Sequence, residues 1–145
     1  MAKMTGGCQC GAVRYELTNP PRRASICHCR MCQRATGSYM APLANVVMSD
    51  FVVTKGELAI YPSSPVAERG FCRACGSPLT FRYTELDDIS VTIGSLDEPD
   101  IAVPTKQFGI ESTSAHWHTL ASLPGSTIEE DMPAEWAEKI STGRN

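Results

Sequence analysis

The seven cysteines constrain the fold of this chain more than any other feature, because all of them fall into three short clusters. The clusters are GGCQCG with Cys8 and Cys10, CHCRMC with Cys27, Cys29 and Cys32, and FCRACG with Cys72 and Cys75. An odd number of cysteines cannot be paired completely by disulfides, and spacings this short are typical of metal sites. The pattern favours metal or thiol chemistry, although ordinary buried cysteines are an alternative interpretation.

Length and charge exclude several classes of protein. A chain of 145 residues fits one domain, which we expect to span residues 1–145. Its net charge of −3 has the wrong sign for a protein that binds nucleic acid. No apolar run approaches the roughly 18 residues of a membrane span, and MAKMTGG lacks the apolar core of a signal peptide. We therefore expect a cytoplasmic protein without a nucleic-acid or membrane partner.

The residue pattern predicts a mainly β fold. Alternating or β-branched stretches occur at residues 12–17, 45–54, 79–83 and 88–94, and each is bounded by turn-forming residues. One short helix is expected from Cys29 to about Ala35, ended by Gly37. A second is expected to start at Asp131 and continue through PAEWAEKI, with Gly143 as its stop.

Two of the cysteine pairs together supply four sulfurs, which is the complete ligand set of a structural zinc ion. Zinc–sulfur bonds of about 2.3 Å place neighbouring sulfurs of a tetrahedron about 3.8 Å apart. Cys8 and Cys10 must lie on a bend to meet this spacing, and Gly6, Gly7 and Gly11 around them permit one. Cys72 and Cys75 have the spacing of a zinc knuckle, in which Gly76 is expected at positive φ. The cage would tie the N-terminus to the middle of the chain.

The three remaining cysteines lack a fourth partner. Cys29 and Cys32, three residues apart at a helix start, are expected to share a face, and Cys27 joins them from the preceding turn. Three protein ligands leave zinc one open position, as in catalytic sites. A soft thiolate site of this kind accepts a further thiol and holds it deprotonated, ready to attack an electrophile such as a carbonyl.

Other interpretations of this trio stay open. A protein group could close the shell and make the site structural, the three thiols could form a metal-free redox cluster, or the site could store zinc. His28 is the obvious candidate for a fourth ligand, but adjacent side chains usually diverge. An exposed or second-shell histidine is the alternative.

At these residues the chain resembles the glutathione-dependent formaldehyde-activating enzyme family of zinc-binding carbon–sulfur lyases. The matching motifs are GGCQCGAVRYEL at 6–17, CHCRMCQRATGS at 27–38, FCRACGSPL at 71–79, IGSLDEP at 93–99 and ESTSAHW at 111–117. The resemblance implies a small zinc-containing β-sheet fold of the β-tent type, related to methionine sulfoxide reductase B. It also implies two zinc ions, a structural one on Cys8, Cys10, Cys72 and Cys75 and a catalytic one on Cys27, Cys29 and Cys32.

In this family glutathione binds at the second zinc and adds to formaldehyde to give S-hydroxymethylglutathione. Many relatives carry a histidine in the segment before the ES motif, where this chain has Gln107. Glutathione has two carboxylates, so its site should offer cations. Arg30 is the candidate chosen here, with Arg34 and Arg73 as further arginines close to the cysteines.

The sequence therefore predicts an enzyme of the carbon–sulfur lyase type, with zinc as its cofactor. Its partners would be glutathione or a related small thiol and formaldehyde or another small aldehyde. The competing hypothesis is a non-catalytic double-zinc β domain that acts as a protein-binding, redox or metal-handling module.

Overall fold

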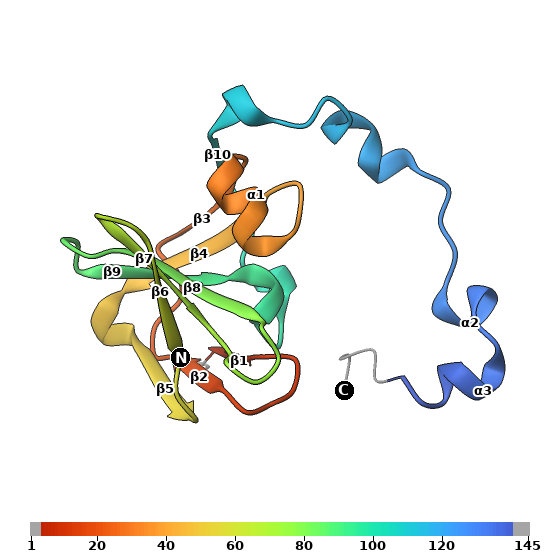
Figure 1. Ribbon diagram of the computed structural model, residues 1–145, viewed down its shortest axis with the longest axis horizontal. Coiled ribbons are helices and arrows are strands. Elements are labelled where there is room, and N and C mark those ends of the chain that lie inside the picture. Colours follow the sequence, from red (N-terminus) through yellow and green to blue (C-terminus); the bar gives the residue numbers. More distant parts are fainter. Residues whose placement is uncertain (1–3, 141–145) are drawn as a thin grey trace. The chain divides into compact units, whose positions relative to one another are not determined.

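The computed structural model describes residues 4–140 (Figure 1). The chain divides into two compact units, with the division between Ser114 and Ala115. Among residues 4–140, all ten strands lie in the first unit, which also contains all seven cysteines, and the elements of the second unit are short helices. The prediction of one domain over residues 1–145 stays a prediction.

Two sheets make up the first unit. The smaller sheet has the order β1-β2-β5, and the larger has the order β10-β3-β4-β9-β8-β7-β6. All strand pairs are antiparallel except the parallel pair of β10 and β3. The strands are β1 (Met4–Gly7), β2 (Arg14–Leu17), β3 (Arg23–Cys27), β4 (Ala41–Val47), β5 (Phe51–Lys55), β6 (Ala59–Ser64), β7 (Ala67–Phe71), β8 (Pro78–Tyr83), β9 (Asp88–Thr92) and β10 (Lys106–Phe108). The predicted mainly β class is confirmed.

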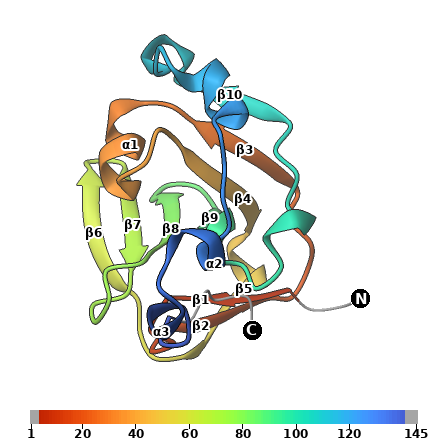
Figure 2. The ribbon, with the colours of Figure 1, turned by 90° about the vertical axis from the view of Figure 1, so that its right-hand side faces the viewer.

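The main hydrophobic core joins the two sheets. Tyr15 and Leu17 alternate with half-buried neighbours on β2 and are buried with Val46, Leu79 and Val91 of the larger sheet. This alternation follows from the two-residue period of a strand, which places every second side chain on the same face. Figure 2 shows β1, β2 and β5 lying together at one end of the larger sheet.

The strand predictions for residues 12–17, 79–83 and 88–94 correspond to β2, β8 and β9, but the prediction of one strand at 45–54 is wrong. That stretch contains the end of β4, a 3-10 turn at Met48–Asp50, and β5, which belongs to the other sheet. Asp50 stabilises the turn because its carboxylate accepts hydrogen bonds from Thr18 and Asn19. Because the apolar pattern continues through the turn, the sequence does not show that β4 and β5 belong to different sheets.

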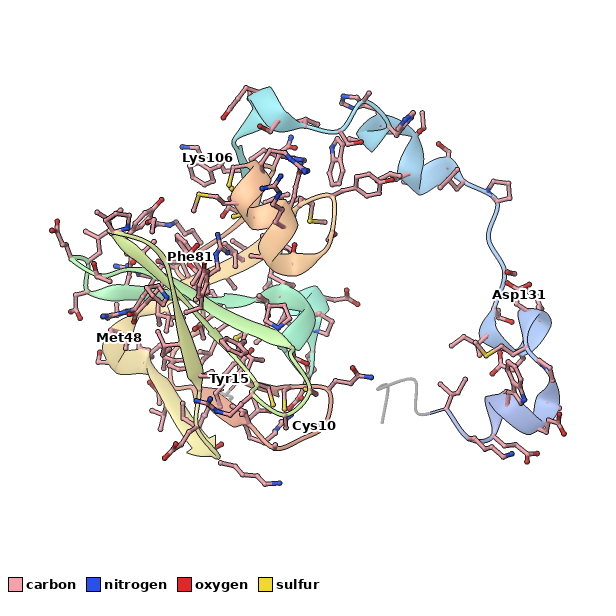
Figure 3. All side chains as sticks on the ribbon, in the orientation of Figure 1. Cys10, Tyr15, Met48, Phe81, Lys106 and Asp131 are labelled. Atoms are coloured by element: carbon pink, nitrogen blue, oxygen red, sulfur yellow. The ribbon has the colours of Figure 1, made fainter. Side chains whose placement is uncertain are left out.

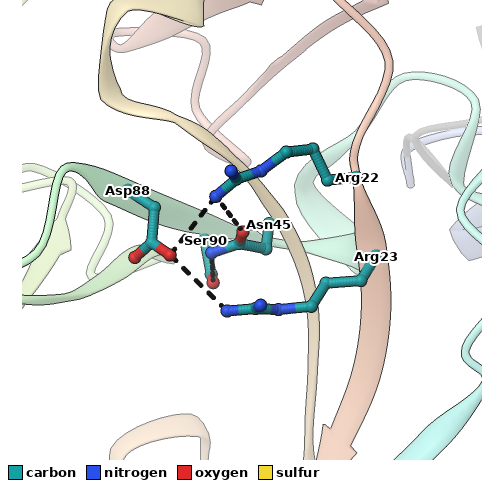
Figure 4. A network of polar contacts seen from close by, with 5 residues as sticks. All are labelled: Arg22, Arg23, Asn45, Asp88 and Ser90. Carbon is teal, nitrogen blue, oxygen red and sulfur yellow. Dashed lines mark hydrogen bonds and ion pairs between the residues drawn. The ribbon is translucent and has the colours of Figure 1, made fainter.

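A polar network holds β3 against its neighbours at the end of the strand opposite Cys27 (Figure 4). Arg22 and Arg23 each approach the Asp88 carboxylate at 3.5 Å, and Arg22 also donates to Asn45 at 3.3 Å. Asn45 in turn donates to Ser90 on β9. Exposed ion pairs individually contribute little to the free energy of folding. We therefore infer that this network fixes the register of β3 and adds little to stability.

The predicted helix at Cys29 is confirmed as α1 (Arg30–Thr36). Cys29 is its N-cap, and the Cys29 sulfur accepts a hydrogen bond from the Cys32 N–H at 3.4 Å. Gly37 ends the helix in the left-handed conformation, with φ of 63°. This termination is the usual role of glycine after a helix.

The predicted helix from Asp131 through PAEWAEKI is confirmed only for residues 134–137, and its predicted start and length are wrong. The second unit instead has α2 (Ile128–Asp131) and α3 (Ala134–Ala137), after a 3-10 helix at Trp117–Ser122. Thr127 begins α2 through a capping box with Glu130, so Asp131 is the last residue of a helix rather than a cap. Met132 is extended before Pro133, as residues preceding proline usually are. Gly143, the expected stop, lies outside the described residues.

Between residues 4 and 140, no helix combines the length and the apolar character that crossing a membrane requires.

Candidate metal centres

The first candidate metal centre joins two turns that are distant in the sequence. Cys8 and Cys10 follow β1, and Cys72 and Cys75 lie between β7 and β8. All four sulfurs lie within 4.8 Å of one another. The Cys8–Cys10 and Cys10–Cys72 sulfur distances are 3.6 and 3.8 Å. These values match the edge of a zinc–thiolate tetrahedron, so the cluster can hold a metal ion.

The two turns of this cluster have the same local geometry. Gly11 and Gly76 both adopt φ of 77°, and each follows directly after a cysteine. Their N–H groups donate to the Cys8 and Cys72 carbonyls at 3.2 and 2.8 Å. The expected bend at Cys8–Cys10 and the expected positive φ at Gly76 are therefore confirmed.

The proton affinities of Cys75 and Cys10 are shifted in opposite directions. A hydrogen bond from the Ser77 hydroxyl, with further backbone hydrogen bonds, lowers the pKa of Cys75 to about 5. A backbone hydrogen bond at Ala12 acts to lower the pKa of Cys10, but the neighbouring Cys8 and Cys75 thiols raise it to about 11. Adjacent thiolates repel one another, so full ionisation of the cluster needs a cation among the sulfurs.

The second candidate metal centre consists of Cys27, Cys29 and Cys32, which we call the trio. Cys27 is the last residue of β3, Cys29 is the N-cap of α1, and Cys32 lies in the first turn of that helix. Their sulfurs lie within 4.8 Å of one another. Cys27 therefore comes from the end of a strand rather than from the expected turn, while Cys29 and Cys32 meet as predicted.

Cys27 and Cys29 of the trio are half-buried and Cys32 is buried, and the pKa values of Cys27 and Cys29 are shifted in opposite directions. Burial raises the pKa of Cys27 to about 12. Burial also acts to raise the pKa of Cys29, but hydrogen bonds from the Cys32 N–H and from the other two thiols hold it below its usual value. The thiolate form is thus favoured first at Cys29, the sulfur at the helix N-cap.

His28 does not join the trio in the part of the chain that the structure describes. Its side chain is fully buried, and Nε2 donates to the Gln107 amide oxygen at 2.7 Å. Of the two expectations for this residue, the exposed histidine is wrong, and the second-shell histidine stays a prediction. Gln107 holds the residue between two of the trio cysteines in place.

The segment around β10 supports the trio from one side. Phe108 lies opposite Cys27 in the parallel pair of β10 and β3, and the His28 N–H donates to the Phe108 carbonyl at 2.9 Å. Gly109 has φ of 61°, and a Cβ there would lie 2.7 Å from the Cys29 nitrogen. This close approach requires glycine. Sequence reasoning missed Gly109, because the sequence does not show that this glycine has positive φ until the turn is known.

The sequence analysis also missed Arg69, a residue that contacts the trio. It lies on β7, and its Nη2 is 3.4 Å from the Cys32 sulfur. Its Nε donates to the Ser63 hydroxyl at 3.0 Å, and the guanidinium lies 4.8 Å from the centre of the Phe81 ring. These contacts fix a positive charge beside the trio. The separation of 37 positions between Arg69 and Cys32 in the sequence explains why no local motif indicated it.

The two clusters lie in different packing environments. Cys8 and Cys72 belong to the main core, with Cys75 packed against it. Cys32 belongs to a small cluster with Ala41 and Leu43, against which Phe81 packs. Figure 3 shows Cys10 and Lys106, at the start of β10, at opposite ends of the first unit. The two centres are therefore separate sites.

Comparison with known proteins agrees with this arrangement. Residues 3–112 match the family model described as glutathione-dependent formaldehyde-activating enzyme. A stretch of 85 residues, 58% of this chain, is 33% identical to an uncharacterized lyase of Schizosaccharomyces pombe, of which it covers 61%. A crystal structure of a Rhodobacter sphaeroides protein aligns with a TM-score of 0.57 and 29% identity, over 72% of this chain and 99% of that one. The family match lies within the first unit, which contains both cysteine clusters.

Proposed function

The chain belongs to the glutathione-dependent formaldehyde-activating enzyme family, and from this premise we propose that it is a carbon–sulfur lyase. The S. pombe relative, itself described as a lyase, supports this class of reaction. The proposed substrates are glutathione or a related small thiol and formaldehyde or another small aldehyde. The proposed location is the cytoplasm.

We assign two zinc ions to each chain. Thiolate ligands favour zinc among the common metals, and the sulfur spacing of the four-cysteine cluster fits a closed tetrahedral site. Cys8, Cys10, Cys72 and Cys75 would hold the structural ion, and the trio would hold the catalytic one. When bound to three thiolates, zinc supplies a soft Lewis acid with room for one more ligand.

One observation carries the proposal of catalysis. In the described part of the chain, the group of mutually close ligand atoms at the trio has three members, and His28 turns away to Gln107. A closed structural site would need a fourth protein ligand. The incomplete set leaves the place that an external thiol requires.

The residues around the trio have separate tasks in the proposed reaction. The Cys32 N–H favours the thiolate of Cys29, and Gly109 and the His28–Gln107 pair position the loop that carries it. The Arg69 guanidinium offsets negative charge that accumulates at the sulfurs. This charge is largest when a further thiolate approaches, so Arg69 favours binding of the nucleophile.

The chemical step forms one bond between the thiol sulfur and the carbonyl carbon. The thiol releases its proton to the solvent, the sulfur electron pair forms the new C–S bond, and the carbonyl π pair moves to oxygen, which takes up one proton from the solvent, so that no net proton is released. In the reverse, lyase direction the C–S bond breaks and the aldehyde leaves. The chain's own residues change no oxidation state.

The test measures exchange between glutathione and its formaldehyde adduct by NMR, against the spontaneous rate. We expect the wild-type chain to accelerate exchange and Cys29→Ser to abolish the acceleration. Cobalt-substituted protein provides a second readout, since an incoming thiol should alter its absorption bands. A wild-type rate equal to the spontaneous rate, with unchanged cobalt bands at saturating glutathione, would refute the proposal and favour a structural double-zinc module.

A further inference from the structure

We propose that a groove beside the trio, lined by Arg34 and Arg69, binds the carboxylate of the thiol substrate. This inference rests on the proposed function and adds a substrate class to it, namely small thiols that carry a carboxylate. The groove has a volume of about 470 Å³, within the range of small-molecule sites. It lies between α1 and strands of the larger sheet.

The groove adjoins the trio through shared residues. Arg69 lines it and also contacts the Cys32 sulfur. Ala41, Leu43 and Phe81 line it and pack around Cys32 as well. A ligand that touches Arg69 in this groove therefore lies next to a sulfur of the trio.

Helix α1 presents one face to the groove. Met31, Arg34 and Ala35 all line it, and their spacing of three and four residues places them on the same side of the helix. Among the described residues, Arg34 makes no hydrogen bond or ion pair, and its side chain is exposed. Its guanidinium is thus available for a carboxylate, which arginine binds in bidentate geometry.

The charge of the groove is unusual for this chain. Its lining contains two arginines and no acidic residue, although the chain has a net charge of −3. Glu68, which neighbours Arg69 on β7, is paired with Arg82 and does not line the groove. By contrast, a hollow of about 630 Å³ elsewhere contains Arg22 and Arg23 together with Asp97 and Glu98. Of these two hollows, only the groove beside the trio has two arginines and no acidic residue in its lining.

A third hollow, of about 640 Å³, bears on whether Arg30 or Arg34 binds the carboxylate. It is lined by Arg30, the residue favoured by the sequence, with Gln33, Tyr39 and Ser112. Arg30 already donates to the Gln33 amide oxygen, and this hollow lacks a second cation. The geometry therefore favours Arg34, one turn further along α1, as the residue that recognises the carboxylate.

The experiment compares three ligands of the zinc-loaded protein by calorimetry. Glutathione has both a thiol and carboxylates, S-methylglutathione has the carboxylates without a free thiol, and cysteamine has a thiol without a carboxylate. We expect Arg34→Gln to weaken binding of glutathione and S-methylglutathione about 10-fold, as loss of a charge-assisted hydrogen bond implies. Binding of cysteamine should change less than about twofold.

Two further variants are matched to this one. Arg23→Gln removes the same charge from an exposed arginine of the polar network, so it controls for the field of the whole chain. Arg30→Gln decides between the two hollows beside α1. We expect both to retain glutathione affinity within about threefold. Equal losses for glutathione and cysteamine in Arg34→Gln, or a loss confined to Arg30→Gln, would overturn the proposal.

Failure of the groove and failure of the proposed function give different results. If cobalt bands of the wild-type protein respond to cysteamine but Arg34→Gln binds glutathione normally, the groove assignment is wrong and the catalytic site stands. If no thiol alters the cobalt bands, the catalytic site is wrong. Binding of S-methylglutathione that depends on Arg34 would then still support the groove.

Discussion

Replacing Cys10 by serine should destabilise the chain far more than its exposed position suggests. Cys10 is exposed, so the substitution removes little packing. It removes one of the four sulfurs that bring the turn after β1 to the turn after β7. The loss therefore reports on the cross-link that the structural zinc would provide, rather than on the core.

The size of this effect follows from the length of the loop that the metal closes. Cys10 and Cys72 are separated by 61 residues, and the chain-entropy relation for a cross-link of this length gives about 4 kcal/mol. The trio, from Cys27 to Cys32, spans only six residues, for which the same relation gives about 2 kcal/mol. For a chain of this size we expect melting temperature to fall by roughly 10–15 °C in Cys10→Ser and by about half of this in a trio variant.

The assay combines zinc content with thermal unfolding at equal protein concentration in zinc-free buffer. Cys29→Ser is the matched variant, because serine at the N-cap still accepts the hydrogen bond that begins α1. Each variant should lose one zinc ion per chain. The reasoning would be refuted if Cys10→Ser lost its zinc but melted no lower than Cys29→Ser, since loop length would then have no part in stability.

Three other predictions concern the surroundings of the clusters. Gly109→Ala should lower the free energy of unfolding by more than about 1 kcal/mol and weaken thiol binding at the trio, because at this positive φ a Cβ would lie 2.7 Å from the Cys29 nitrogen. Urea unfolding measures the first effect and cobalt titration the second. Unchanged values would contradict the close approach. Gln107→Leu should cost about 1 kcal/mol, because it removes the amide that accepts from buried His28, and an unchanged urea midpoint would count against this hydrogen bond. The Arg14 guanidinium, by its hydrogen bond, lowers the pKa of Asp97, so the stabilisation by this pair is present above the unfolded pKa and is lost as pH falls through the folded value. Asp97→Asn should thus reduce stability at pH 7 and become equivalent to wild type in acid, which urea unfolding at both pH values measures; an equal deficit at both would contradict the linkage.

The two groups of cysteines that meet in the structure were predictable from sequence because their grouping depends on short spacings. Because Cys29 and Cys32 are three positions apart, they lie on one face of a helix start, independently of the rest of the fold. The pairing of the N-terminal turn with the Cys72–Cys75 knuckle followed from the number of sulfurs that a closed site requires. Local geometry and ligand number were sufficient for both inferences.

The surroundings of the trio were not predictable in this way. Arg69, Gln107 and Gly109 reach it through strand pairing over long sequence separations, and such pairing depends on the order of strands in the sheet. The strand predicted at 45–54 failed for a related reason, since β4 and β5 belong to different sheets. An alternating pattern indicates a strand but does not say which sheet receives it.

The difference between the two centres lies in how each can accommodate negative charge. Four thiolates around a divalent ion carry a formal charge of −2, and at the four-cysteine cluster fixed hydrogen bonds, such as the Val13 N–H to the Cys8 sulfur at 3.2 Å, stabilise it. Three thiolates at the trio would carry only −1, and Arg69 already offsets this charge from the edge of an arginine-lined groove. A thiolate that binds there would bring the formal charge to −2, as at the four-cysteine cluster, and the Arg69 guanidinium already lies beside it. We therefore expect the ligand set to be permanent at the four-cysteine cluster, where backbone donors stabilise the sulfurs, and exchangeable at the trio, where the Arg69 side chain joins it to the groove.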